Sequence, residues 1–139
     1  MKIFLFLFLL APLLEGWELL SSVDLERKYD EFTGQETDVP VFNETLRNAE
    51  GSKMTLAGYV IPLEANKNSP YFILSRYPYQ SCFFCGAAGP ETVVEVYASD
   101  PVNFPMDQRI RVEGTFKLNE NDPLHLFYIL EDARVEIPD

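Results

Sequence analysis

The sequence predicts a mainly all-β protein: a small five-stranded OB-like barrel with an N-terminal extension and one short helix. Three observations support this prediction. Aromatic residues make up 14% of the 139 residues, and rings and β-branched side chains suit strands better than helices. Residues 109–118 alternate between apolar and polar side chains, the period of a strand with one buried face. Two predicted strands contain a glycine, which allows a small sheet to bend into a closed barrel.

The N-terminus predicts a secretory signal over residues 1–16. A basic start at Lys2 precedes an apolar run, residues 3–14, which is broken only by Pro12. This run is shorter than the roughly 20 residues that span a bilayer, and Gly16 is the best cleavage position. We therefore expect a periplasmic or secreted protein, without stable membrane insertion after cleavage, in an oxidising compartment.

The segment before the barrel, residues 17–49, is expected to pack on it as an extension. Its predicted parts are an extended piece or single loose turn at 17–23 with Trp17 on the core, a polar acidic stretch at 24–37, an edge strand at 39–42 that contains Pro40, and a helix at 43–49 capped by Asn43 or Thr45.

The predicted barrel domain covers residues 50–139 and contains five strands. They are expected at 54–63, 71–77, 92–98, 109–118 and 124–130, the last continuing to 137 with a bend at 131–132. Residues 51–59 and 107–115 resemble one another, because each has a polar turn followed by an alternating strand with a glycine inside it, Gly58 or Gly114. Bends at these glycines favour a closed barrel, with an open meander or a sandwich fragment as the alternative.

Charge and motifs exclude several functions. A net charge of −11 argues against nucleic-acid partners, whose phosphates are bound by Lys and Arg, and against an anionic membrane surface. The sequence has no P-loop, dinucleotide fingerprint or G-x-S-x-G motif. Its only histidine makes a Ser-His-Asp triad improbable. We expect no enzyme activity and no catalytic residues.

Both cysteines lie in the C-x-x-C of the loop at 78–91, and the residues leave three interpretations open. An oxidising compartment favours a Cys82–Cys85 disulfide that pins the loop. Two thiolates at this spacing also bind zinc or copper, with His125 as a third ligand. A thiol-disulfide oxidoreductase is the third interpretation, but the Gly-Ala-Ala-Gly-Pro segment after Cys85 is a poor helix, and such active sites need one.

Several motifs resemble a family of small secreted bacterial proteins with no assigned function. They are G-Y-V-I-P-L at 58–63, Y-F-I-L-S at 71–75, S-C-F-F-C-G at 81–86, G-P-E at 89–91, Y-I-L-E-D-A at 128–133 and W-E-L-L at 17–20.

A broader set of secreted bacterial domains of unknown function is distantly similar. In that set a Cys-x-His loop stands where this chain has C-x-x-C. Cys82 then matches the shared cysteine, and Phe84 stands at the position of the histidine, with Cys85 as the next residue. The resemblance implies a metal site, because one soft ligand replaces another there, and some members are thought to accompany metal-transport systems.

We therefore predict a secreted, non-enzymatic binding module that holds zinc or copper through Cys82, Cys85 and His125, as an accessory to a transport system. A structural or interaction domain with a Cys82–Cys85 disulfide is the first alternative, and a thiol oxidoreductase is the second.

Overall fold

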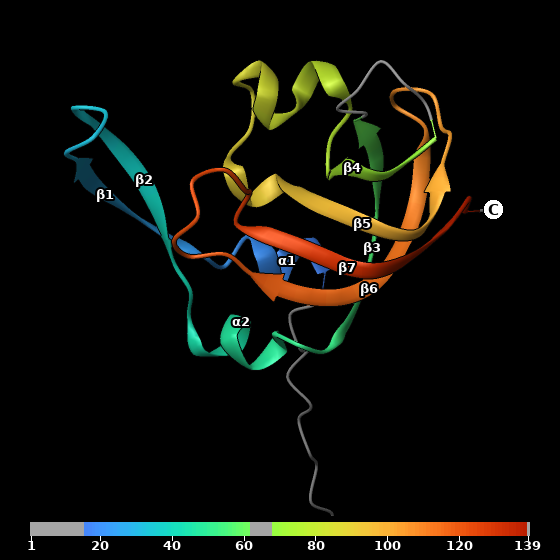
Figure 1. Cartoon of the computed structure of the whole chain (residues 1–139), viewed down its shortest axis with the longest axis horizontal. Helices are drawn as coiled ribbons and strands as arrows, with labels where there is room; N and C mark the ends of the chain where they lie inside the picture. The colour runs from blue at the N-terminus through green and yellow to red at the C-terminus, as the bar shows by residue number, and fades with distance from the viewer. Residues whose placement is uncertain (1–15, 62–67, 139) are drawn as a thin grey trace, which may run out of the picture.

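The computed structural model of the protein describes residues 16–61 and 68–138. Five strands form a closed barrel in the order β3-β4-β5-β7-β6, with β6 pairing back onto β3 (Figure 1). The predicted small all-β barrel is confirmed. The strands are β3 (Lys53–Ile61), β4 (Ser69–Ser75), β5 (Val93–Val102), β6 (Arg109–Leu118) and β7 (Tyr128–Glu136).

Strand β7 lies between β5 and β6 and pairs with them in opposite senses. It runs parallel to β5, with Glu95 opposite Ile129, and antiparallel to β6, with Phe116 opposite Leu130. The other barrel pairs, β3–β4, β4–β5 and β3–β6, are antiparallel. This arrangement gives the barrel one parallel seam, at β5–β7.

The two strand glycines have different roles. At Gly58 the register with β6 is continuous, but an added Cβ would lie 2.4 Å from the Ser75 carbonyl oxygen of β4. Glycine is required there because two backbones approach closely. At Gly114 the β6–β7 register shifts, and Asp132 on β7 has φ +50°. Opposite Gly114, β7 therefore carries the bulge that was expected as a bend at 131–132.

The core lies inside the barrel and continues under the N-terminal segment. Two short helices, α1 (Gly16–Leu20) and α2 (Glu44–Ala49), contribute buried side chains to the same cluster as the strands. Trp17 packs on this cluster as predicted, and its indole Nε1 donates to the Ala57 carbonyl at 2.8 Å. Asn43 caps α2 by accepting from the Leu46 amide at 2.9 Å. The described residues thus contain one short α-helix more than the sequence predicted.

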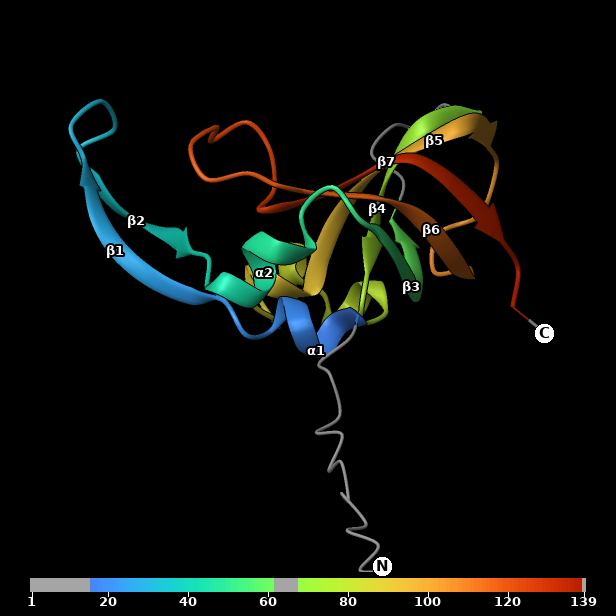
Figure 2. The ribbon, with the colours of Figure 1, turned by 90° about the horizontal axis from the view of Figure 1, so that it is seen from below.

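A β-hairpin between the two helices extends away from the barrel (Figure 2). It consists of β1 (Asp24–Asp30) and β2 (Gln35–Val41), which form a separate two-stranded sheet. The sequence predicted only its last part, the edge strand around Pro40. The polar stretch before it was not recognised as a strand because nearly every residue in β1 and β2 is exposed.

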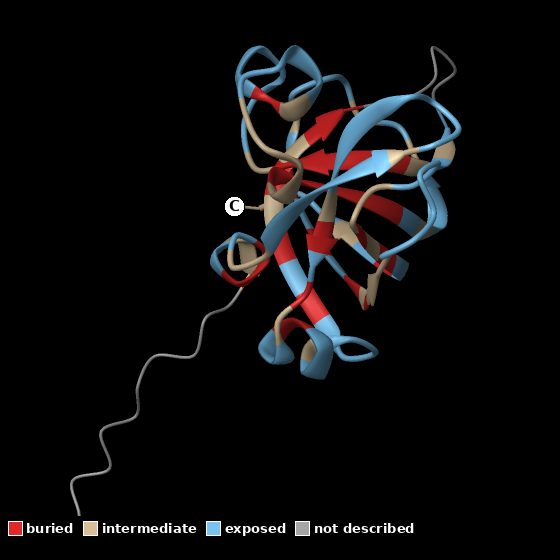
Figure 3. Cartoon of the chain, turned by 90° about the vertical axis from the view of Figure 1, so that its left-hand side faces the viewer, coloured by how far each residue is buried: buried red, intermediate tan, exposed pale blue. Residues whose placement is uncertain are grey.

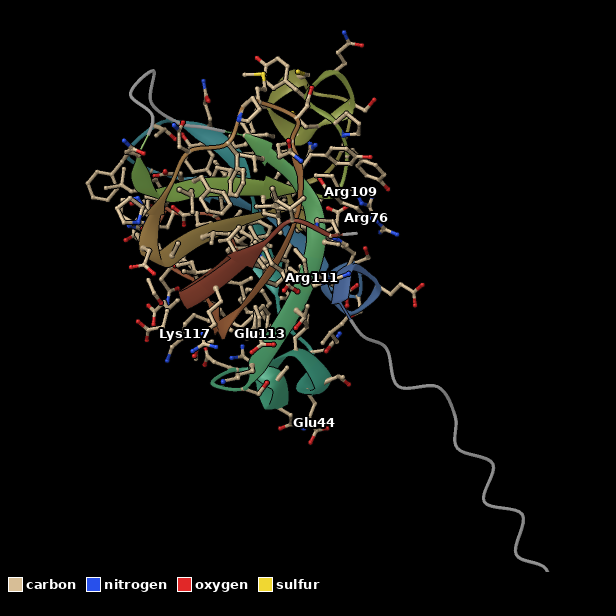
Figure 4. All side chains as sticks on the ribbon, turned by 90° about the vertical axis from the view of Figure 1, so that its right-hand side faces the viewer. Glu44, Arg76, Arg109, Arg111, Glu113 and Lys117 are labelled. Atoms are coloured by element: carbon tan, nitrogen blue, oxygen red, sulfur yellow. The ribbon has the colours of Figure 1, made fainter. Side chains whose placement is uncertain are left out.

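Among the barrel strands, β6 has the predicted bounds and β7 does not. The outer face of β6 is exposed to solvent and carries Arg109, Arg111 and Glu113 (Figure 4). On its inner face Ile110 and Val112 are fully buried. The last strand begins at Tyr128, not at residue 124 as expected, because residues 119–127 form a loop. No helix in the described ranges is long and apolar enough to cross a membrane. The predicted signal lies outside these ranges except for Gly16.

Candidate functional site: the Cys82–Cys85 loop

The loop between β4 and β5 consists of three short 3₁₀ turns, η1 (Tyr79–Ser81), η2 (Phe83–Cys85) and η3 (Pro90–Thr92). Cys82 separates the first two turns, and its carbonyl accepts from the Cys85 amide at 3.2 Å. Gly86 ends the second turn in the left-handed region at φ +76°, a conformation that costs little only for glycine. The sequence Cys-Phe-Phe-Cys-Gly therefore folds into one tight turn that brings both thiols together.

The two thiols are close, reduced and unequally exposed. Their sulfur atoms are 3.9 Å apart, which is hydrogen-bonding distance and far beyond a disulfide bond of about 2.05 Å. Cys82 is fully buried and belongs to a small cluster with Ile61, Ile73 and Val93. Cys85 is exposed, and its Sγ donates to the Tyr79 carbonyl at 2.9 Å.

The loop does not activate the exposed thiol. Desolvation and the neighbouring Cys82 thiol raise the pKa of Cys85 above its usual 9.0, and Asp107 adds to the effect. A redox-active C-x-x-C works with a lowered thiol pKa, usually at a helix N-terminus. Here a 3₁₀ turn and Gly86 follow the pair instead.

His125 lies apart from the sulfur pair. It sits in the 119–127 loop, and its Nδ1 is 3.1 Å from Oε1 of Glu95. The neighbouring Leu126 packs against the cluster that contains Cys82, but no group of three His, Cys, Asp or Glu side chains suited to a metal ion occurs among the described residues. The structure therefore brings together Cys82 and Cys85 of the predicted ligands, and places His125 with another partner.

Glu95 is a buried carboxylate that the sequence analysis did not single out. Its side chain is only 2% exposed and accepts from the Tyr71 hydroxyl, from His125 and from the Leu126 amide at 3.0 Å. These contacts raise the pKa of His125 above 6.5, mainly through the hydrogen bond to Glu95 and its charge, and burial with Glu95 raises the pKa of Tyr71. The Glu95 network fastens the 119–127 loop to the barrel wall.

The signal for Glu95 was its position in the sequence. It is the one charged residue in the run Val93-Val94-Glu95-Val96, and all four side chains are buried. A carboxylate within such a run must either pair or lose its charge.

Fold and loop together define a small all-β barrel that carries an adjacent pair of thiols. A solved structure with a similar fold is that of a DUF3299 family protein from Pseudomonas aeruginosa PAO1, with a TM-score of 0.54 and 25% sequence identity. The match covers 72% of this chain and 68% of that protein. No known family profile and no curated protein matches the sequence. The similarity agrees with a relation to proteins of unknown function, while the loop motif and secretion stay predictions.

Proposed function

We propose that the protein is a non-enzymatic binding module that holds one soft or borderline transition-metal ion between Cys82 and Cys85. The sulfur–sulfur distance of 3.9 Å carries this proposal. Two sulfurs bound to one tetrahedral Zn²⁺ at about 2.3 Å each lie about 3.8 Å apart. The thiols therefore need almost no rearrangement to share an ion, and zinc and Cu⁺ are the ions that thiolates favour.

The exposure of Cys85 fits a site that exchanges its ion. Structural zinc sites close around the metal with four protein ligands, whereas open sites leave positions for other donors. Cys82 anchors the site in the barrel wall and Cys85 faces solvent, so that a partner protein has access to the ion from the Cys85 side. We place this module in the periplasm or outside the cell as an accessory to a transport system, in line with the family resemblance.

Binding must release protons, since the ligand is the thiolate and not the thiol. The raised pKa of Cys85 makes this competition stronger than for an ordinary cysteine. The proposal therefore includes a pH dependence, with affinity falling as the pH decreases.

The test is titration of the reduced protein with Cu⁺ and separately with Zn²⁺, each buffered by a chromophoric chelator. We expect one ion per chain in the native protein and loss of this site in both Cys82→Ser and Cys85→Ser. His125→Ala is the matched control, because His125 points to Glu95, and it should retain the ion. Co²⁺ substitution should give a thiolate charge-transfer band of the intensity expected for two sulfurs.

Two results would overturn the proposal. One is stoichiometry or affinity that is unchanged in both serine variants, since the ion would then bind elsewhere. The other is protein purified without reductant whose mass is lower by two hydrogen atoms and whose reduced form binds neither ion. That result would make the cysteine pair a loop-pinning disulfide.

A further inference from the structure

The β1–β2 hairpin is unusual because both of its faces are exposed except near Val39 and Pro40. Figure 3 shows it exposed over most of its length in front of the buried barrel. An isolated two-stranded hairpin in water is at best marginally stable, so an uncovered one favours a partner. The hairpin and the facing 119–127 loop also expose large apolar side chains, which are Leu25, Tyr29, Phe32, Val41 and Leu124.

A groove separates the hairpin from this loop. It has a volume of about 280 Å³, and it is lined on one side by residues of β2, including Thr37 and Val39, and on the other by residues 119–123, His125 and Phe127. Strand β2 pairs with β1 along one edge, and no other strand of the described ranges pairs with it. The groove is too small for a drug-sized ligand but has room for side chains of an added strand.

The groove is acidic. Four carboxylates line it, and the lining contains no Lys or Arg. Arg27 lies 3.5 Å from Asp38 and Arg47 is paired with Glu120, so two of the four already have a cation nearby. Of the other two, Asp122 lies 3.8 Å from Nε2 of His125, which also lines the groove, and Asp30 has no Lys, Arg or His paired with it among the described residues. The hairpin itself, residues 24–41, has six Asp or Glu against two Lys or Arg, a net charge of −4.

We propose that this groove docks an extended, Lys- or Arg-containing segment of a partner protein, which adds as a third strand beside β2. Strand addition satisfies the free backbone edge of β2 as far as Val39, since Pro40 has no N–H to donate. The carboxylates select basic side chains, and the exposed apolar residues cover the rest of the added strand. This surface does not include the cysteine loop, and its function does not depend on a bound metal.

Charge decides between a foreign partner and a second copy of the chain. Two copies would each bring a net charge of −11, and their hairpins would place like charges against one another. A basic segment gains from the same field, which also speeds its association at low salt.

The test uses two fluorescein-labelled ten-residue peptides of alternating composition, Lys-Val and Glu-Val, and follows fluorescence anisotropy. We expect the full-length protein to bind the Lys-Val peptide, more weakly as salt rises, and not the Glu-Val peptide. Asp38→Lys, in the groove, should lower the affinity about tenfold. Glu26→Lys is the matched control, because it makes the same charge change on the same hairpin outside the groove lining and should change affinity less than about threefold.

Hydrogen exchange then separates strand addition from general charge attraction. Bound Lys-Val peptide should slow exchange of β2 backbone amides. Equal loss of affinity in both variants, absence of any Lys-Val binding, or unchanged exchange in β2 would each overturn the proposal. A dimer of the native chain in light scattering that Asp38→Lys abolishes would also overturn it, because the groove would then belong to a second copy.

Discussion

The hydroxyl of Tyr128 connects the N-terminal helix to the barrel. Tyr128 is fully buried at the start of β7, and its ring lies 5.7 Å from that of Phe116 and 5.9 Å from that of Phe42. Its hydroxyl donates to the Leu20 carbonyl at 2.7 Å. Leu20 is the last residue of α1, where helix carbonyls lack partners within the helix. Burial, with a contribution from Glu91, raises the pKa of Tyr128, so the hydroxyl keeps its proton as a donor.

Tyr128→Phe retains the packed ring and removes only this hydrogen bond. The variant leaves the buried Leu20 carbonyl without its partner, a loss of about 1–3 kcal/mol in the free energy of unfolding. For a domain of this size, about 4 °C per kcal/mol gives a decrease of about 4–12 °C in melting temperature. The effect should be concentrated in α1, since the barrel strands keep their own hydrogen bonds.

Urea denaturation followed by circular dichroism measures the loss, and native-state hydrogen exchange locates it. Tyr29→Phe is the control, because Tyr29 is 66% exposed on the hairpin and should change stability by less than about 0.5 kcal/mol. Equal stability of the two variants, or faster exchange spread evenly over β6 and β7 but not α1, would refute the role assigned to the Tyr128 hydroxyl.

Two further predictions concern the barrel and the buried carboxylate. Gly58→Ala should lower the free energy of unfolding, measured in urea, by about 1–3 kcal/mol, because its Cβ would meet the Ser75 carbonyl. Gly86→Ala has open space around its Cβ and should lose only about 1–2 kcal/mol, because its backbone is in the left-handed region. A larger loss at Gly86 would contradict this reasoning. His125 gives the only imidazole signal in the NMR spectrum, and this signal should titrate above pH 6.5. The stabilising contribution of the protonated imidazole is present below pH 6.5 and is lost as the pH rises through the raised pKa. In Glu95→Gln the titration midpoint should move back toward 6.5, and an unchanged midpoint would argue against the Glu95 contact.

The barrel could be predicted because β3 and β6 alternate between buried and exposed side chains. In β6, Ile110, Val112 and Phe116 point inward and are fully buried, so apolar residues recur at every second position of the sequence. The parallel seam between β5 and β7 could not be predicted, since the pairing of strands depends on the closure of the whole barrel. The β1–β2 hairpin was not predicted, because strands that are exposed on both faces show no alternation of apolar and polar residues.

His125 was expected on the last strand because residues 124–130 are mostly apolar. The loop arises instead from Asn119, whose side-chain amide donates to the carbonyls of Asp122, His125 and Leu126 and whose Oδ1 accepts from the Asp122 amide. Such side-chain contacts to the backbone compete with strand pairing, and apolar content alone does not reveal them.

The closeness of the two thiols was predictable from the C-x-x-C spacing, but their unequal exposure was not. It depends on how the 3₁₀ turns fold Cys82 back against Ile73 of β4 and Val93 of β5, the two neighbouring strands that the loop joins.

The parallel seam described above also constrains how the chain folds. Pairing of Glu95 with Ile129 and of Lys53 with Thr115 joins residues distant in sequence, whereas β4–β5 and β6–β7 connect neighbours along the chain. We expect these two local antiparallel units to form early and closure of the barrel to be the slow step, on the millisecond-to-second scale typical of small barrels dominated by non-local contacts. Until closure, the edges of β5 and β7 and those of β3 and β6 remain available to other chains, so the unclosed intermediate is the species most exposed to aggregation.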